Sequence, residues 1–194
     1  MSNDIRGAEQ ARAVSKRKAI LDAATSLMVA GGLRRVTHRQ VAAQANVPVG
    51  SVGYYYSSRE QLIEVCFAQI HERRLDVARR ILAEAAPGRS AAEVADDVIA
   101  IATAGDPEGV PGLIYSVVDA QRELEGPRRA RVGEHVRKAL ELIDDLLERS
   151  GFSTITARDA TFALIGAGVL ADPERENLHG SARSAVIAAL TPAL

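Results

Sequence analysis

Apolar side chains recur along this chain at the three- and four-residue spacing of amphipathic helices. In residues 16–30, this spacing places apolar side chains together on one helical face. They are Ile20, Ala23, Ala24, Leu27 and Met28. Gly31 and Gly32 follow directly, and glycine commonly ends a helix because it adopts the left-handed conformation without a steric penalty. The pattern therefore predicts a first helix that ends near residue 30.

The rest of the chain repeats this pattern, and no segment shows the alternation of a half-buried strand. Alanine is abundant and favours helix, and capping residues, glycines and prolines separate the apolar stretches. We predict eight more helices, over residues 38–45, 48–56, 59–86, 91–104, 113–125, 126–149, 157–170 and 181–190. Residues 105–112 and 171–180 are expected to be loops. The predicted fold class is all-α.

Cap signals support these helix starts. A Ser or Thr that caps a helix accepts a hydrogen bond from the backbone, and an acidic or amide side chain three residues on reaches back. Three segments have this spacing: Thr37–Gln40, Ser90–Glu93 and Thr156–Asp159. For the helix that begins at residue 59, either Ser57 or Ser58 is suitably placed.

Residues 38–56 have the spacing of a helix-turn-helix, a motif whose second helix enters the major groove of DNA. Asn46 in the turn tolerates the left-handed conformation, and Pro48 suits the first turn of the second helix. Val41, Val47, Val52 and Tyr56 are expected in the core of this small domain rather than at its surface.

Charge is distributed unevenly around this motif. Residues 1–59 contain nine Lys and Arg against three Asp and Glu, a net charge of +6, although the whole chain carries −1. Residues 60–194 carry −7. A basic segment of this kind favours a polyanionic partner such as DNA.

Lys16, Arg17 and Lys18 stand at the start of the predicted first helix. Cations there oppose the helix dipole at a cost of about 0.3–1 kcal/mol each. Phosphate binding would explain their presence, and a solvated, frayed terminus is the alternative.

Composition excludes several other classes of protein. Cys66 is the only cysteine, so an internal disulfide and a cysteine-based zinc site are impossible. No apolar run reaches the roughly 18 residues of a membrane span, and the first fifteen residues lack the apolar core of a signal peptide. We expect a cytoplasmic protein with no membrane partner, no cofactor and no metal.

Residues 18–67 resemble the DNA-binding domain of the TetR family of transcriptional regulators. The resemblance rests on the alanine-rich first helix with its glycine turn, on Thr37 before Val41-Ala42, and on residues 45–47. It continues through residues 50–52, the aromatic cluster Tyr54-Tyr55-Tyr56 and residues 58–62. The family implies a three-helix DNA-binding domain, here residues 1–57, and a helical ligand-binding and dimerisation domain, here residues 58–194.

The resemblance also implies which side chains contact DNA. Arg39 would reach a base edge or a phosphate, Thr37 would cap its helix with His38 beside it, and Val49, Gly50 and Ser51 would begin the recognition helix. Tyr55 and Arg59 match positions that bind phosphates, and Tyr54 is the candidate to take over the phosphate contact of position 53, which is otherwise lost. Lys16 and Lys18 are phosphate candidates by charge. His38 is equally compatible with a solvated side chain.

The sequence departs from the family pattern at three of these positions. Pro48 cannot cap a helix through its side chain, and Val49 offers only apolar contact where the family often has a polar or basic residue. Gly53 replaces a tyrosine that usually holds a phosphate, and glycine costs a helix about 0.5–1 kcal/mol relative to alanine. These departures leave the strength of base readout open.

The second domain offers candidates but no motif. An apolar ligand site between helices is predicted to draw on Phe67, Ile70, His71, Arg74, Tyr115, Val118, Gln121 and Arg122, and core or surface roles are the alternative. Cys66 is expected to be an inert core residue. Residues 162–170 are apolar nearly all round, which favours either a dimer interface or a central buried helix. The predicted dimer residues are Phe162, Ile165, Gly166 and Val169.

The predicted function is a DNA-binding regulator: a homodimer that binds a palindromic operator on double-stranded DNA and is released by an unidentified small molecule. An enzyme is disfavoured because the chain contains no G-x-S-x-G, P-loop or H-E-x-x-H sequence. The single Glu-x-x-His spacing, Glu176 to His179, lacks the second copy that a carboxylate-bridged metal site needs. A general DNA binder, or a ligand-binding or interaction protein with weak DNA binding, remains the alternative.

Overall fold

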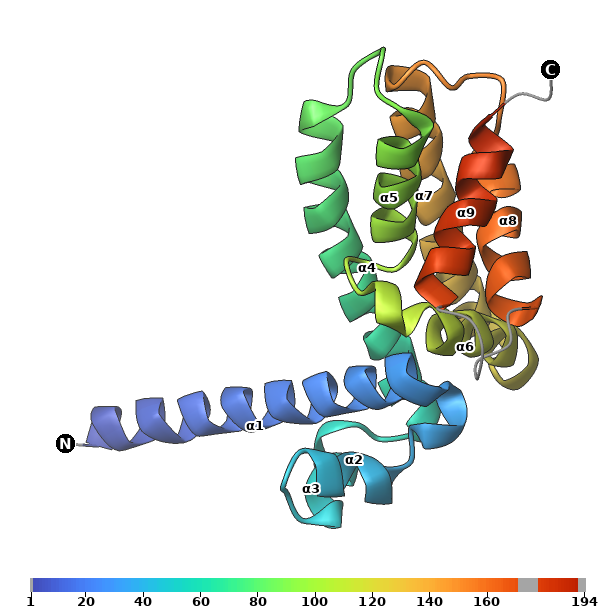
Figure 1. Cartoon of the computed structure of the whole chain (residues 1–194). Helices are drawn as coiled ribbons and strands as arrows, with labels where there is room; N and C mark the ends of the chain where they lie inside the picture. Colours follow the sequence, from blue (N-terminus) through green and yellow to red (C-terminus); the bar gives the residue numbers. More distant parts are fainter. Residues whose placement is uncertain (1, 171–177, 192–194) are drawn as a thin grey trace.

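The computed structural model describes residues 2–170 and 178–191, in which helices are joined by turns and loops and no strand occurs. A head formed by α1, α2 and α3 lies at one end of the molecule, and α4 leads from it into a bundle of helices (Figure 1). In the bundle, α5, α7, α8 and α9 stand side by side, and α6 crosses their lower end, where it contacts α1.

The head comprises α1 (Ser2–Gly31), a short 3₁₀ turn η1 (Leu33–Arg35), α2 (His38–Gln44) and α3 (Val49–Tyr55). The body comprises α4 (Arg59–Glu84), α5 (Ala91–Ala102), η2 (Pro107–Gly109), α6 (Val110–Glu123), α7 (Gly126–Arg149), α8 (Ala157–Leu170) and α9 (Leu178–Leu190). Nine α-helices in the described residues agree with the predicted fold class.

The largest error in the predicted elements concerns the first helix, which begins at Ser2 rather than at Lys16. Half of residues 2–15 are good helix formers, with three alanines, two arginines, one glutamate and one glutamine. The apolar stripe marked only the part of α1 that packs against the rest of the protein. Lys16, Arg17 and Lys18 therefore lie in the middle of α1, where the helix dipole does not oppose them, and the prediction that they begin a helix is wrong.

Two smaller errors concern loops. The segment predicted as the loop 105–112 contains η2 and the start of α6. α9 begins at Leu178 rather than at Ser181. Residues 171–177, with Glu176, belong to the other predicted loop and lie outside the described residues.

Two hydrophobic cores hold the chain together. The first joins α1, α2 and α3 to the start of α4 and also includes Ala120, Leu124 and Val132 from the α6–α7 region. The second joins α5, α7, α8 and α9. Because the first core extends across residue 57, the head is packed as one unit with part of the body; the domain boundary at that residue stays a prediction.

Candidate DNA interface and ligand cavity

Local hydrogen bonds and backbone geometry position the helix-turn-helix. Thr37 caps α2, because its hydroxyl accepts from the backbone N–H of Gln40 at 3.2 Å. The Gln40 side chain reaches back to the Thr37 hydroxyl, at 3.1 Å, rather than to its backbone. Asn46 has φ 52°, which confirms the predicted left-handed turn. Pro48 occupies the N-cap position directly before α3, whereas the sequence predicted it within the first turn of that helix.

One side of α3 faces the core and the other faces solvent. Val52 and Tyr56 are buried, as predicted, and the Tyr56 hydroxyl donates to the backbone oxygen of Arg17 at 3.3 Å. Tyr54 is 83% exposed and packs edge-on against Tyr55, with 5.1 Å between the ring centroids. The arrangement leaves this side of the helix open to a partner.

The exposed side of α3 begins with Val49 and Gly50, and Ser51 beside them is half-buried. Gly53 is also exposed, with open space where a Cβ would stand. The side of α3 that would face DNA therefore carries no charged side chain. It consists of a valine, a serine, two glycines and a tyrosine.

The positive charge of the head comes instead from the elements around α3. Arg39 on α2 is exposed, as are Arg34 and Arg35 in η1 and Lys16 on α1, and none of these has an ion pair within the described residues. Lys18 is different, because it pairs with Asp22 at 2.5 Å. Arg34 and Arg35 were absent from the predicted contacts; their signal is two adjacent arginines immediately before a helix-turn-helix.

Two other predicted DNA contacts are at least partly buried. His38 is half-buried, and its Nε2 has no hydrogen-bond partner in the described part of the chain. Tyr55 is half-buried against the first core. Contact with a phosphate remains a prediction for both.

Arg59 occupies the junction between head and body. Its Nε donates to the carbonyl of Val36 at 2.9 Å and its Nη2 to the carbonyl of Leu33 at 2.7 Å. Its Nη1 pairs with Glu123 of α6 at 2.6 Å. All three bonds tie the start of α4 to η1 and α6, so a DNA phosphate would have to compete with Glu123 for this guanidinium.

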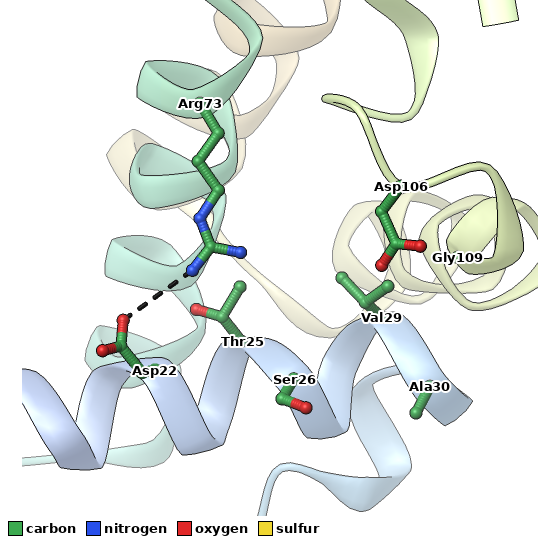
Figure 2. A pocket seen from close by; sticks show the side chains of 8 residues that line it. All are labelled: Asp22, Thr25, Ser26, Val29, Ala30, Arg73, Asp106 and Gly109. Atoms are coloured by element: carbon green, nitrogen blue, oxygen red, sulfur yellow. Dashed lines mark ion pairs between the residues drawn. The ribbon is translucent and has the colours of Figure 1, made fainter. Parts of the chain in front are cut away.

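A polar groove of about 330 Å³ also lies at this junction, between α1, α4 and the segment that precedes α6. Figure 2 shows Asp22, Thr25 and Ser26 of α1 on one side, Arg73 of α4 above them and Asp106 opposite. Hydrogen bonding from Lys18 lowers the pKa of Asp22, while burial opposes the shift.

The far end of this groove closes because α6 touches the backbone of α1. A Cβ on Gly112 would stand 1.8 Å from the carbonyl oxygen of Val29, and one on Gly109 would stand 2.3 Å from the Val29 side chain. The Ser116 hydroxyl donates to the carbonyl of Gly112 at 2.7 Å and lies 3.3 Å from the carbonyl of Met28. Only glycine permits this approach.

An apolar cavity of about 190 Å³ lies inside the body, between α4, α5, α6, α7 and α8. Its walls are aliphatic except for one arginine and two threonines. The lining residues are Arg74, Ala102, Thr103, Leu113, Ile114, Val117, Val118, Val136, Ala139, Leu140, Ile143, Thr161, Leu164 and Ile165.

Of the predicted ligand residues, Arg74 and Val118 lie on the wall of this cavity. Phe67 and Ile70 are buried in the first core. His71 is buried and packs against His135 of α7, with the rings tilted by 35° and their centroids 4.6 Å apart. Tyr115, Gln121 and Arg122 are exposed on α6. Ligand contact remains a prediction for these six residues, because the wall of the cavity is made mostly of other side chains.

Twelve of the fourteen lining residues were not predicted as ligand contacts. Six of them lie within residues 113–140, where the prediction favoured polar side chains such as Tyr115 and Gln121 over their aliphatic neighbours: Leu113, Ile114, Val117, Val136, Ala139 and Leu140. The other six lie on α5, α8 and a later turn of α7. The walls from α5 and α8 come from helices distant in the chain. A usable signal was present in α8, where Thr161 is a polar side chain within an apolar helix. Its hydroxyl is buried without a hydrogen-bond partner in the described structure.

The predicted dimer residues on α8 divide between two faces. Phe162 is 62% exposed, and Val169 and Leu170 are exposed beyond it. These exposures exclude a helix buried within one subunit. Ile165 lies on the cavity wall, and Gly166 is half-buried with open space where a Cβ would stand.

Cys66 confirms the expectation of a core residue. It is fully buried, and burial raises the pKa of its thiol to about 12.

No group of three or more metal-ligating side chains, and no helix long and apolar enough for a bilayer, occurs in the described ranges.

Comparison with known proteins agrees with this architecture. Residues 20–66 match the family model of bacterial regulatory proteins of the tetR family. No curated protein matches the chain significantly.

Solved structures match nearly the whole chain. The multidrug binding protein EbrR, complexed with imidazole, is 25% identical, with a TM-score of 0.60 over 92% of this chain and 96% of that chain. SCO1917, a TetR-family member from Streptomyces coelicolor, is 26% identical, with a TM-score of 0.60 over 92% and 99%. FadR from Bacillus subtilis, complexed with stearoyl-CoA, shares the fold at 19% identity and a TM-score of 0.56, over 87% and 95%.

These matches fall on the elements described above. The family model covers the last part of α1, then α2, α3 and the start of α4, and the solved structures extend the likeness through the bundle. The predicted resemblance is thereby confirmed. Residues 20–66 therefore match the helix-turn-helix DNA-binding domain of TetR-family transcription regulators, and the whole chain has the fold of solved proteins of that kind.

Proposed function

We propose that this regulator is a homodimeric repressor that binds a palindromic operator and releases it when a small molecule occupies the cavity. The observation that carries the proposal is the open side of α3, surrounded by exposed arginines without ion pairs in the described structure. Unpaired cations bind phosphates by releasing counterions, while α3 meets base edges in the major groove.

The contacts between α6, α4 and the head support a ligand response. α6 supplies Leu113 and Val117 to the cavity wall, and the same helix carries Glu123, the partner of Arg59. A ligand that favours a shifted α6 would therefore shift the head as well. Differential affinity for two arrangements is sufficient for such coupling.

The exposed apolar side chains of α8 support a dimer. A monomer rarely leaves a large phenylalanine and two aliphatic side chains exposed on one helix. A two-fold dimer through α8 and α9 supplies two heads, as a palindrome with half-sites about 34–36 Å apart requires.

Solved relatives support the small-molecule step by analogy. EbrR is described as a multidrug binding protein and has been solved with ethidium and with malachite green, at 24% and 25% identity to this chain. FadR has been solved with stearoyl-CoA. Cytoplasmic location and the lack of enzymatic activity remain expectations.

The test begins with selection of random genomic fragments by the purified protein at physiological salt, followed by sequencing. We expect one enriched palindrome. Arg39→Ala should then weaken binding to it by about 10-fold or more, since a bidentate arginine–base contact contributes about 1–3 kcal/mol. Fluorescence anisotropy with a labelled duplex measures the change.

Arg80→Ala is the matched control, because Arg80 is an exposed arginine on α4, outside the proposed DNA surface. It should leave affinity for the palindrome unchanged. Fragments without a common motif, or equal affinities for the wild type and Arg39→Ala, would favour the alternative of a ligand-binding or interaction protein with weak DNA binding.

A further inference from the structure

The cavity contains a buried cation that no acidic side chain neutralises. Arg74 is only 7% exposed, and it forms no ion pair within the described residues. Its Nε donates to the carbonyl of Ile101 at 2.9 Å and its Nη2 to the carbonyl of Ala102 at 3.1 Å. Both carbonyls lie at the C-terminal end of α5.

The two carbonyls satisfy only part of the hydrogen-bonding capacity of Arg74. They give Arg74 a structural role, since the helix dipole stabilises a cation near a helix C-terminus. A guanidinium has five N–H donors, however, and Nη1 has no acceptor in the described structure. A buried charge is costly unless an opposite charge compensates it.

The surroundings of Arg74 add positive charge. The positive charge of Arg74 lowers the pKa of both His71 and His135, after the larger effect of burial, and Lys138 acts in the same direction on both. Glu72 and Glu134 are exposed, and Glu134 pairs with Lys138 at 3.0 Å. Burial lowers the pKa of Arg74 itself to about 10, so the guanidinium stays charged at neutral pH.

The remaining wall sets the size and polarity of the occupant. Thr103 donates its hydroxyl to the carbonyl of Ile99 at 2.8 Å, so Thr161 is the second polar group available. The other lining side chains are aliphatic. An apolar cavity of about 150 Å³ accommodates benzene, so about 190 Å³ suits a single ring or a short chain with one polar group.

We propose that the cavity binds a small apolar carboxylate, with the carboxylate on Arg74, a hydrogen bond from Thr161 and the apolar part against α6, α7 and α8. This inference rests on the proposed function as a ligand-responsive regulator and specifies its ligand class. A carboxylate is planar and bidentate, which matches the guanidinium. An organic cation would place a second positive charge against Arg74 in a low-dielectric site.

The test compares three ligands of one size and different charge: benzoate, benzyl alcohol and benzylamine. Isothermal titration calorimetry with the full chain measures affinity, and thermal unfolding reports stabilisation by the bound ligand. Benzoate should bind at least about 10-fold more tightly than benzyl alcohol, as expected for a hydrogen-bonded charge. Benzylamine should bind the most weakly.

Variants then locate the preference for an anion. Arg74→Met should remove the advantage of benzoate over benzyl alcohol while it retains binding of the alcohol. Arg80→Met, with the same charge change at an exposed site of α4, should behave as the wild type. Thr161→Val keeps the Arg74 side chain and should weaken benzoate by a smaller factor, so the comparison survives if Arg74→Met does not fold.

Two outcomes would overturn the ligand class: benzylamine or benzyl alcohol binding as tightly as benzoate, or no benzoate binding at millimolar concentration. The proposed function fails differently. Binding of benzoate that leaves the selected palindrome fully bound would retain the carboxylate site and remove ligand-controlled release.

Discussion

At the scale of single residues, Arg39 and Arg59 show how two arginines with the same predicted role differ in structure. Arg39 is exposed and has no ion pair among the described residues. Arg59 donates to two backbone carbonyls and pairs with Glu123. The first is available to DNA, whereas the second already stabilises the junction of head and body.

Arg59→Ala should therefore lower the free energy of unfolding by roughly 1–3 kcal/mol, because it removes two hydrogen bonds and an ion pair made by a partly buried charged group. Chemical denaturation followed by circular dichroism measures the loss. Glu123→Gln, which removes only a partly exposed ion pair, should cost about 0–1 kcal/mol. Equal stability of Arg59→Ala and Arg39→Ala would contradict the structural role of Arg59.

A second residue-scale prediction concerns the His71–His135 pair. Burial lowers the pKa of both imidazoles, with each further lowered by neighbouring positive charge. Below about pH 6.5, the unfolded chain binds protons that the folded chain resists. Stability should be fully present above that pH and should fall as pH decreases towards the lowered pKa values of the folded state.

His71→Phe removes one of these titrating groups from the buried site and keeps a ring there. Its free energy of unfolding should decrease less between pH 7 and pH 5 than that of the wild type, as measured by urea denaturation at each pH. An unchanged pH dependence would show that His71 titrates alike in the folded and unfolded chain.

At the scale of elements, α6 contacts both the cavity and the head, and glycine sets its distance from α1. Gly112→Ala would force a Cβ against the carbonyl oxygen of Val29, which must shift α6. We expect a loss of about 1–3 kcal/mol, typical of overpacking, together with altered affinity for the operator. Thermal unfolding and anisotropy measure the two effects.

Gly133→Ala is the matched control for that substitution. Gly133 lies within α7, and a Cβ there would have open space around it. This change should stabilise the protein by about 0.5–1 kcal/mol, because alanine favours helix. If both substitutions stabilised the chain, the close contact between α1 and α6 would not exist in solution.

The elements also show what the sequence predicts and what it does not. Hydrophobic periodicity and capping residues predicted the bounds of α7 and α8 as observed, and those of α2 and α3 to within one residue, because these signals are local in sequence. Residues 2–15 of α1 lack an apolar stripe, so periodicity missed them. The cavity was largely missed for two reasons: half of its unpredicted lining residues are aliphatic side chains within residues 113–140, which local sequence does not distinguish from core, and most of the others come from α5 and α8, which are distant in the chain.

At the scale of the whole molecule, the exposed face of α8 gives the proposed dimer a testable surface. Phe162→Glu places a charge where the proposed partner would bury it, and should convert dimer to monomer at micromolar concentration in sedimentation velocity. Val14→Glu changes another exposed apolar side chain, on α1, and should leave the oligomeric state unchanged. A dimer that persists in Phe162→Glu would move the interface elsewhere.

The first core has a consequence for the construction of hybrid regulators. It is common to treat a reading head and a sensing body as exchangeable parts joined at a linker. Here the head shares side-chain packing with Ala120, Leu124 and Val132, and Val29 fits against Gly109 and Gly112. A hybrid protein that takes only residues 1–57 from this chain would lose the complementary packing between the head and the α6–α7 region. A head intended for transplantation should bring the matching surface of α6 with it, or be redesigned against the α6 of its new host.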